Sequence, residues 1–257
     1  MTVTSPPQQR YVEQVMGMPV SLAMRGLHTD DRAASQAWET CLEVLREADR
    51  VFSTYRDDSF VSRLGSGELT VDQCPAEVAE VLAIGERARA ESGGAFDVRR
   101  PGPDGTLVLD PSGVVKGWAV QRAAAPLLAL DDTDVCLSAG GDMVCHVAGP
   151  EREPWSVGVE DPHDPTRVLA VVPVRRGAVA TSGHAHRGHH VVDPRTGRPP
   201  DDIASVTVVA PDLVTADVDA TAAYAMGRAG LAWLERRGRA GLVVWADGTA
   251  EVYGSPA

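Results

Sequence analysis

Apolar residues in the first part of the chain recur at the spacing of an α-helix. After Asp30 or Asp31, either of which can cap a helix, one stripe of apolar positions falls on a single helical face: Trp38, Cys41, Leu42, Leu45 and Ala48. A second helix is predicted from Pro75, a residue favoured at the first helical position, to a stop at Gly93-Gly94.

The same spacing predicts a third helix after Gly117. Pro126 should kink or end this helix, because proline lacks a backbone donor and clashes with the preceding turn. Residues 53–68 are polar and rich in turn-forming residues, so a loop is expected there. A strand is predicted at residues 20–24, before the first helix.

Beyond residue 134 the pattern changes to short β-rich runs separated by glycine and proline. Strands are predicted at residues 135–138, 143–147, 155–160, 168–174 and 203–209. Helices at about residues 216–226 and 231–236 interrupt them, and a hairpin is expected to close around Asp247-Gly248. Because helices and strands are grouped rather than alternating, we expect an α+β fold with mixed or antiparallel sheets and several flanking helices. No glycine-rich linker divides the chain, so a single domain is expected over residues 1–257, ordered from about residue 10 to about residue 253.

The formal net charge of −12 limits the partners of this protein. Nucleic-acid-binding proteins collect positive charge on one surface, and no basic run occurs here, so no nucleic-acid partner is expected. An acidic chain that binds an anionic ligand must supply a local cation or a helix N-terminus. Lys116 is the only lysine in the sequence and is therefore a candidate for that cation.

The four cysteines form no C-x-x-C pair, and the N-terminus has no charged-then-apolar leader. These features predict free thiols and a cytoplasmic location. Cys41, on an apolar helical stripe, is expected to be a core residue. No apolar run approaches the ~20 residues that a membrane-spanning helix needs, so no membrane span is expected.

Two polar segments are candidates for ligand binding. Residues 51–64, VFSTYRDDSFVSRL, place an aromatic residue among hydroxyl, arginine and aspartate side chains, which suits either a binding loop or a solvated turn. In residues 94–117, Asp110 ends an apolar run and a Pro-Ser-Gly turn precedes Lys116. A strand, a tight turn and a lysine at a helix start can form an anion cradle, although an ordinary strand-to-helix turn fits equally well.

A third segment, residues 178–197, contains His184, His186, His189 and His190. A histidine cluster can bind zinc, but the H-E-x-x-H spacing of metalloproteases is absent. An exposed histidine-rich loop is the simpler interpretation. Asp193-Pro194 is expected to begin a turn.

The fourth segment, ADVDATA, places Asp217 and Thr221 four residues apart, so that both oxygens lie on one helical face. A carboxylate and a hydroxyl are hard ligands that suit Mg²⁺, an ion that prefers phosphate-bearing partners. The alternative is purely structural, with Asp217 as a helix N-cap and Thr221 bonded back to the preceding turn. Asp219 is expected to point elsewhere, toward solvent.

Seven segments together resemble the FAD:protein FMN transferase (ApbE) family, in the family's order and over about residues 16–227. They are FSTYRDDSFVSRL, GAFDV, LDPSGVVKGWAV, SAGGD, TSG, HVVDPRTG and ADVDATA. Each segment is weak alone, and their common order carries the resemblance. The sequence departs from the family pattern at Pro111, at Val218-Asp219 and at His184, where tyrosine is common.

The resemblance implies an activity and a set of site residues. The side chains of Asp217 and Thr221 and the backbone oxygen of Gly113 would hold Mg²⁺. Lys116, Asp217 and His190 would take part in catalysis. FAD, the substrate, would be contacted by Met16, Tyr55, Ala95, Phe96, Asp97, Asp110, Lys116, Val191 and Ala220.

The expected reaction moves FMN from FAD onto a serine or threonine hydroxyl of a target flavoprotein subunit, with release of AMP. Phosphoryl chemistry depends mainly on charge neutralisation and in-line positioning. His190 is the candidate base, because the ordinary histidine pKa lies near neutrality. Two alternatives use the same residues: a hydrolase that splits FAD into FMN and AMP, and a non-catalytic FAD-binding protein.

Overall fold

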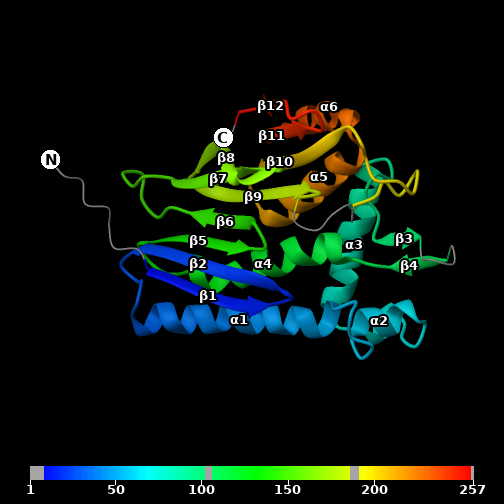
Figure 1. The fold of residues 1–257 in the computed structure, drawn as a ribbon. Helices are drawn as coiled ribbons and strands as arrows, with labels where there is room; N and C mark the ends of the chain where they lie inside the picture. The colour runs from blue at the N-terminus through cyan, green and yellow to red at the C-terminus, as the bar shows by residue number, and fades with distance from the viewer. Residues whose placement is uncertain (1–8, 102–105, 186–190, 256–257) are drawn as a thin grey trace.

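A computed structural model describes residues 9–101, 106–185 and 191–255 of the protein. Within these ranges, eight strands form one sheet in the order β1-β2-β5-β6-β9-β10-β11-β12, with every neighbouring pair antiparallel. Figure 1 shows the strands stacked in this order, from β1 and β2 at the bottom to β12 at the top. The strands of this sheet are β1 Gln9–Val15, β2 Met18–Gly26, β5 Thr133–Ala139, β6 Asp142–His146, β9 Arg176–Gly183, β10 Ile203–Ala210, β11 Ala240–Trp245 and β12 Ala250–Tyr253.

Helices cover one face of this sheet and a two-stranded ribbon covers the other. Apolar strand residues such as Val206 and Val208 pack with the helices in the main core, whereas Val179 and Cys145 pack under the ribbon. Neighbouring strand residues face opposite sides, so the sheet is buried on both faces. The ribbon is β7 Trp155–Asp161 with β8 Asp164–Val174, and a second small ribbon is β3 Arg99–Pro101 with β4 Leu107–Leu109.

The helices are placed by caps and by aromatic contacts. Asp31 caps α1 by accepting a hydrogen bond from the N–H of Ala34. Phe52 at the end of α1 meets Trp118 of α4 edge to face, with ring centroids 5.3 Å apart. The helices are α1 Arg32–Phe52, α2 Phe60–Gly65, the 3₁₀ turn η1 Val71–Gln73, α3 Ala76–Glu91, α4 Ser112–Leu128, α5 Leu213–Ala225 and α6 Arg228–Arg236.

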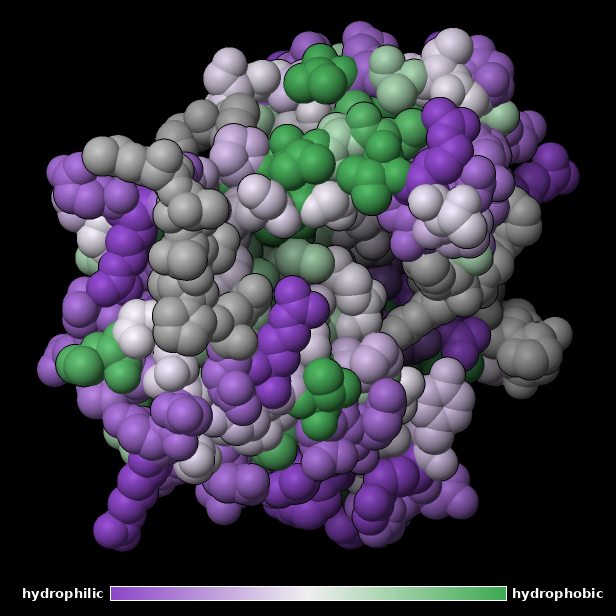
Figure 2. All heavy atoms as spheres, turned by 60° about the vertical axis from the view of Figure 1, so that its left-hand side comes forward, coloured by the Kyte–Doolittle hydropathy of each residue, from purple (hydrophilic) through white to green (hydrophobic). Residues whose placement is uncertain are grey.

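This arrangement confirms the expected α+β class with a large antiparallel sheet. Cys41 is fully buried, as its position on the α1 stripe predicted. No helix in the described ranges has both the length and the apolar character required to cross a bilayer. The face drawn in Figure 2 is mostly hydrophilic, with hydrophobic residues gathered in its upper part.

Several element boundaries differ from the predictions. Helix α4 begins at Ser112 rather than after Gly117, so Lys116 lies inside the helix and not at its start. Pro126 lies in the last turn of α4, which continues for two residues and ends at Leu128. The expected loop at residues 53–68 contains α2. Strands β1 and β9 were not predicted.

Candidate functional site

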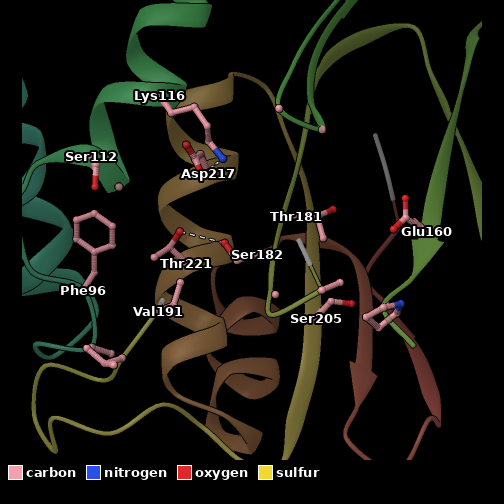
Figure 3. A pocket seen from close by; sticks show the side chains of 18 of the residues that line it. Phe96, Ser112, Lys116, Glu160, Thr181, Ser182, Val191, Ser205, Asp217 and Thr221 are labelled. Carbon is pink, nitrogen blue, oxygen red and sulfur yellow. Dashed lines mark hydrogen bonds and ion pairs between the residues drawn. The ribbon is translucent and has the colours of Figure 1, made fainter. Parts of the chain in front are cut away.

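Helix α5 carries the predicted metal pair. Asp212 caps this helix by accepting a hydrogen bond from the N–H of Thr215, so the prediction of Asp217 as a possible N-cap is wrong. Asp217 and Thr221 lie one turn apart and both line a cavity of about 410 Å³ (Figure 3). The Thr221 hydroxyl is 3.0 Å from the hydroxyl of Ser182 on β9, which fixes its direction.

Lys116 reaches this pair from α4. Its ammonium forms ion pairs with Asp142, at the start of β6, and with Oδ1 of Asp217 at 3.3 Å. Burial alone would lower the pKa of Lys116, but the carboxylates of Asp217 and Asp142 outweigh it and raise this pKa above its ordinary value. Lys116 therefore stays charged inside the cavity wall.

The buried carboxylates of Asp142 and Asp217 thus share the single ammonium of Lys116, and the pKa of Asp217 reflects this imbalance of charge. Burial raises the pKa of Asp217 to about 7, the charge of Lys116 opposes this rise, and the charge of Asp142 adds to it. The site is short of positive charge by one unit when both acids are ionised. A bound cation would remove that deficit.

Gly117 of α4 allows α4 and α5 to approach closely. A Cβ at Gly117 would lie 2.9 Å from the carbonyl oxygen of Leu213 and 3.0 Å from Cβ of Asp217. Without it, the N–H of Gly117 donates to Oδ2 of Asp217 at 3.1 Å. In a helix this N–H points along the axis toward the carbonyl of residue i−4, here Gly113. Gly113 and Asp217 both line the cavity.

The cavity continues into a second hollow of about 1180 Å³. Five residues line both spaces, so the two hollows form one elongated cleft with Lys116 at their junction: Arg100, Asp110, Ser112, Lys116 and Val192. An elongated ligand with a charged middle fits this shape better than a compact one.

Most residues predicted to contact FAD lie along this cleft. The first hollow is lined by Ala95, Phe96, Asp97 and Val191, and the second by Met16 and Tyr55. The Phe96 ring faces the start of α4 in Figure 3, and a Cβ at Gly113 would come within 3.1 Å of it. Asp110 is held by Arg100, whose Nε lies 2.8 Å from its carboxylate.

Two residues of the second hollow are unusual, Met16 in its backbone conformation and Tyr55 in its exposure. Met16 and Gly17 form the two-residue turn between β1 and β2, and both have positive φ, at 55° and 69°. A turn with two positive φ angles suits the twist of the hairpin. Residues other than Gly, Asn and Asp rarely adopt a positive φ, so the backbone conformation of Met16 is unusual. Tyr55 is 98% exposed, which leaves its ring available to a ligand.

One predicted residue, Ala220, is not brought to the cleft, and another lies outside the described residues. Ala220 is fully buried on α5 and lines neither hollow. His190 lies outside the described residues, together with His186 and His189, so the base and the zinc hypotheses remain predictions. Within the described ranges, no cluster of three or more His, Cys, Asp or Glu residues is arranged to hold a metal ion.

The prediction for Asp219 was wrong. This side chain is only 2% exposed and points away from the cleft into an arginine pair. Arg239 Nε lies 2.6 Å and an Arg237 amino group 3.3 Å from its two oxygens. Asp217 and Asp219 therefore anchor opposite sides of one helix.

Sequence reasoning also missed part of the cavity wall. Thr181, Ser205 and Glu160 line its far end, across β9 from the Asp217 pair (Figure 3). The Ser205 side chain is buried, and its hydroxyl has no hydrogen-bond partner among the described residues. Ser205 lies inside a β-rich apolar run, so only the close approach of β9, β10 and the ribbon reveals its place in the cavity.

Comparison with known proteins gives one consistent answer. The ApbE family model matches residues 16–101 and 100–243. The FAD:protein FMN transferase of Haemophilus influenzae is 25% identical over 244 residues, which cover 72% of this chain and 70% of that protein. The FAD:protein FMN transferase of Treponema pallidum is 26% identical over 264 residues, with coverage of 74% and 71%.

Solved structures share the whole fold. The apo flavinyl transferase ApbE of Pseudomonas stutzeri superposes with a TM-score of 0.82 at 24% identity, over 98% of this chain and 96% of that one. The flavin transferase ApbE of Vibrio cholerae gives a TM-score of 0.81 at 23% identity, over 98% of both chains. At these identities the superpositions establish a common architecture.

Proposed function

The chain belongs to the ApbE family, and from that premise we propose that it transfers the FMN half of FAD to a serine or threonine hydroxyl of a target flavoprotein. The relatives named above are FAD:protein FMN transferases, which makes this chain an enzyme of that type. The observation that supports the finer assignment is the Asp217–Thr221 pair beside Lys116, placed at the middle of an elongated cleft.

The residues of this centre fit a magnesium ion. Asp217, Thr221 and the Gly113 carbonyl offer hard oxygen donors, which Mg²⁺ prefers. The raised pKa of Asp217, caused first by burial, marks a place where one more positive charge is favourable. When bound, Mg²⁺ would neutralise charge on the diphosphate of FAD.

The chain's own residues then have distinct tasks. Lys116 stays protonated between Asp142 and Asp217 and presents a fixed positive charge at the junction of the two hollows. The flanking hollows would hold the two ends of FAD and orient the FMN-side phosphorus toward the acceptor. His190 is the proposed base that removes the acceptor proton, and AMP leaves with its phosphate as the new phosphoester bond forms.

The test combines FAD, Mg²⁺ and a flavoprotein subunit bearing a candidate acceptor hydroxyl. We expect covalent flavin on the acceptor and AMP in equal amounts, as measured by in-gel fluorescence and chromatography. Asp217→Asn should lower the rate at least about 100-fold, the scale of losing one preorganised electrostatic contact. Glu235→Gln, on the exposed face of α6, is the matched control and should keep full activity.

Two outcomes would contradict the proposal. AMP release without labelled acceptor would identify a hydrolase instead. FAD binding with no AMP release, unaffected by Asp217→Asn, would identify a non-catalytic flavin-binding protein.

A further inference from the structure

Cys136 and Cys145 face each other on neighbouring strands, on the face of the sheet that the β7–β8 ribbon covers. They are directly paired in the β5–β6 register, and their sulfur atoms lie 3.7 Å apart with both thiols free. Directly opposed residues of antiparallel strands have Cα atoms about 4.5–5.5 Å apart, within the range that a disulfide spans. To form the bond, the sulfur atoms must approach from 3.7 Å to about 2.05 Å.

The pair belongs to a row of residues that crosses the sheet. The register places Arg10 of β1 opposite Ala23 of β2, Ala23 opposite Cys136, and Cys136 opposite Cys145. Cross-strand neighbours share a face of the sheet, so all four side chains point the same way. Only the small Ala23 separates the exposed Arg10 from Cys136 in this row.

The two thiols have different surroundings. Cys145 is 2% exposed and packs under the ribbon with Trp155 and Val157, whereas Cys136 is only partly buried. Arg25, from the strand beside β5, is fixed near this row by its ion pair with Asp134 at 2.7 Å and by its position over the Trp155 ring. A half-buried thiol near two arginines, backed by a buried second thiol, is the arrangement of a reactive cysteine and its resolving partner.

The pKa shifts of the Cys136 and Cys145 thiols agree with these surroundings. The hydrogen bond from Cys145 lowers the pKa of Cys136, burial opposes this shift, and the charges of Arg25 and Arg10 lower it further. The same hydrogen bond, together with burial, raises the pKa of Cys145. The other cysteines differ: burial raises the pKa of Cys41 to about 12, and burial also raises that of Cys74.

We propose that Cys136 and Cys145 form a reversible thiol–disulfide site that is oxidised by hydroperoxides, with Cys136 as the attacking sulfur. The Cys136 thiolate attacks the outer oxygen of the hydroperoxide, the O–O bond breaks, and an alcohol or water leaves as Cys136 becomes a sulfenic acid. The Cys145 sulfur then attacks the Cys136 sulfur and expels water. In total, two thiols and one hydroperoxide give one disulfide, one alcohol or water, and one water, with two electrons passed from sulfur to oxygen.

The test uses the full chain and graded hydrogen peroxide, followed by alkylation of the remaining thiols and peptide mapping. We expect two of the four thiols to disappear together, a peptide linked through Cys136 and Cys145, and full recovery of both thiols with dithiothreitol. Cys145→Ser should leave a sulfenic acid on Cys136 that dimedone traps. Cys136→Ser should leave Cys145 as a thiol at the same peroxide concentration.

Cys74→Ser is the matched control, because Cys74 is also partly exposed but has no cysteine partner nearby, and it should leave the linked peptide unchanged. The mapping of the wild-type protein decides the matter even if a serine variant folds poorly. Oxidation of Cys74 or Cys41 before the pair, or linkage only between molecules, would overturn the proposal.

Discussion

At the scale of single residues, the buried carboxylates differ in how completely positive groups balance their charge. Asp134 is fully buried, yet it accepts hydrogen bonds from Arg25, from Arg152 and from the N–H of Ala148. Asp142 and Asp217 instead share Lys116, which leaves their charge incompletely balanced. The first arrangement stabilises the fold, whereas the second leaves unbalanced negative charge at the cavity wall.

The buried Asp134 leads to a prediction about stability and pH. Burial would raise its pKa, but its hydrogen bonds and the two arginines hold that pKa below the ordinary value. The stabilisation is therefore complete above the ordinary aspartate pKa of about 3.9 and is lost as the pH falls below it. Asp134→Asn should lower the free energy of unfolding by roughly 3–5 kcal/mol at pH 7, because two arginines lose their buried partner.

Urea unfolding at pH 7 and near pH 3 provides the measurement for this prediction. The gap between the wild-type protein and Asp134→Asn should narrow at the lower pH. Asp132→Asn is the control: Asp132 also pairs with Arg152 but its side chain is 66% exposed, so we expect a change below about 1 kcal/mol. An equal gap at both pH values would contradict the assigned ionisation.

At the scale of elements, α5 connects the cavity to the arginines Arg237 and Arg239 near the C-terminus. One face presents Asp217 and Thr221 to the cavity, and the opposite face carries Asp219, which Arg237 and Arg239 hold from the C-terminal part of the chain. Helix α4 packs against the first face so closely that only glycine fits at position 117. The site geometry thus depends on the spacing of two helices.

That spacing predicts the effect of one added methyl group. Gly117→Ala should press on Leu213 and Asp217, lower the free energy of unfolding by about 1–3 kcal/mol, and reduce flavin transfer at least about tenfold. Gly149→Ala is the control, because Gly149 lines neither hollow and the added Cβ would meet only Arg152 at 4.0 Å. Thermal unfolding and the transfer assay measure the two effects, and a fully active Gly117→Ala would show that the helices can separate without harm.

Much of the element pattern was predictable because it rests on local periodicity. Residues close together in the sequence are enough to predict the α1 stripe, the Asp31 cap and the Asp217–Thr221 spacing. The partners of Asp219 lie 18 and 20 residues further along the chain, so no local pattern reveals that it is buried. Strand β1 was missed because it is a mostly exposed edge strand with little apolar alternation.

At the scale of the whole molecule, the cleft extends from the first hairpin to the far side of the main sheet. Tyr55 lies in the hollow next to the β1–β2 turn, and Ser205 lies at the other end, between the sheet and the ribbon. Tyr55 and Ser205 line different hollows of the cleft. A ligand that fills both hollows would therefore meet them independently.

Binding of FAD should reflect this independence. We expect Tyr55→Ala to weaken FAD binding by about 1–3 kcal/mol through loss of a stacking surface, and Ser205→Ala by about 1 kcal/mol through loss of a hydrogen bond. The effects should add in the double variant, because distant sites without shared partners are additive. Titration calorimetry measures the affinities, with Val71→Ala as an exposed control outside the cleft.

Stability offers an internal check on the same variants. Ser205→Ala should not lower the free energy of unfolding, because the buried hydroxyl has no described protein partner to lose. A destabilised Ser205→Ala would show that the hydroxyl has a protein partner, and strongly non-additive effects would show that Tyr55 and Ser205 do not act independently.

The order of strands in the main sheet has a consequence for biosynthesis. Strand β2 pairs with β5 more than a hundred residues later, and the cavity is closed by β9, β10 and α5. A chain emerging from the ribosome therefore exposes Lys116 well before Asp217 and Thr221 exist to meet it. Nascent chains cannot capture the dinucleotide early, and the enzyme acquires its substrate only after translation has passed the last of these residues.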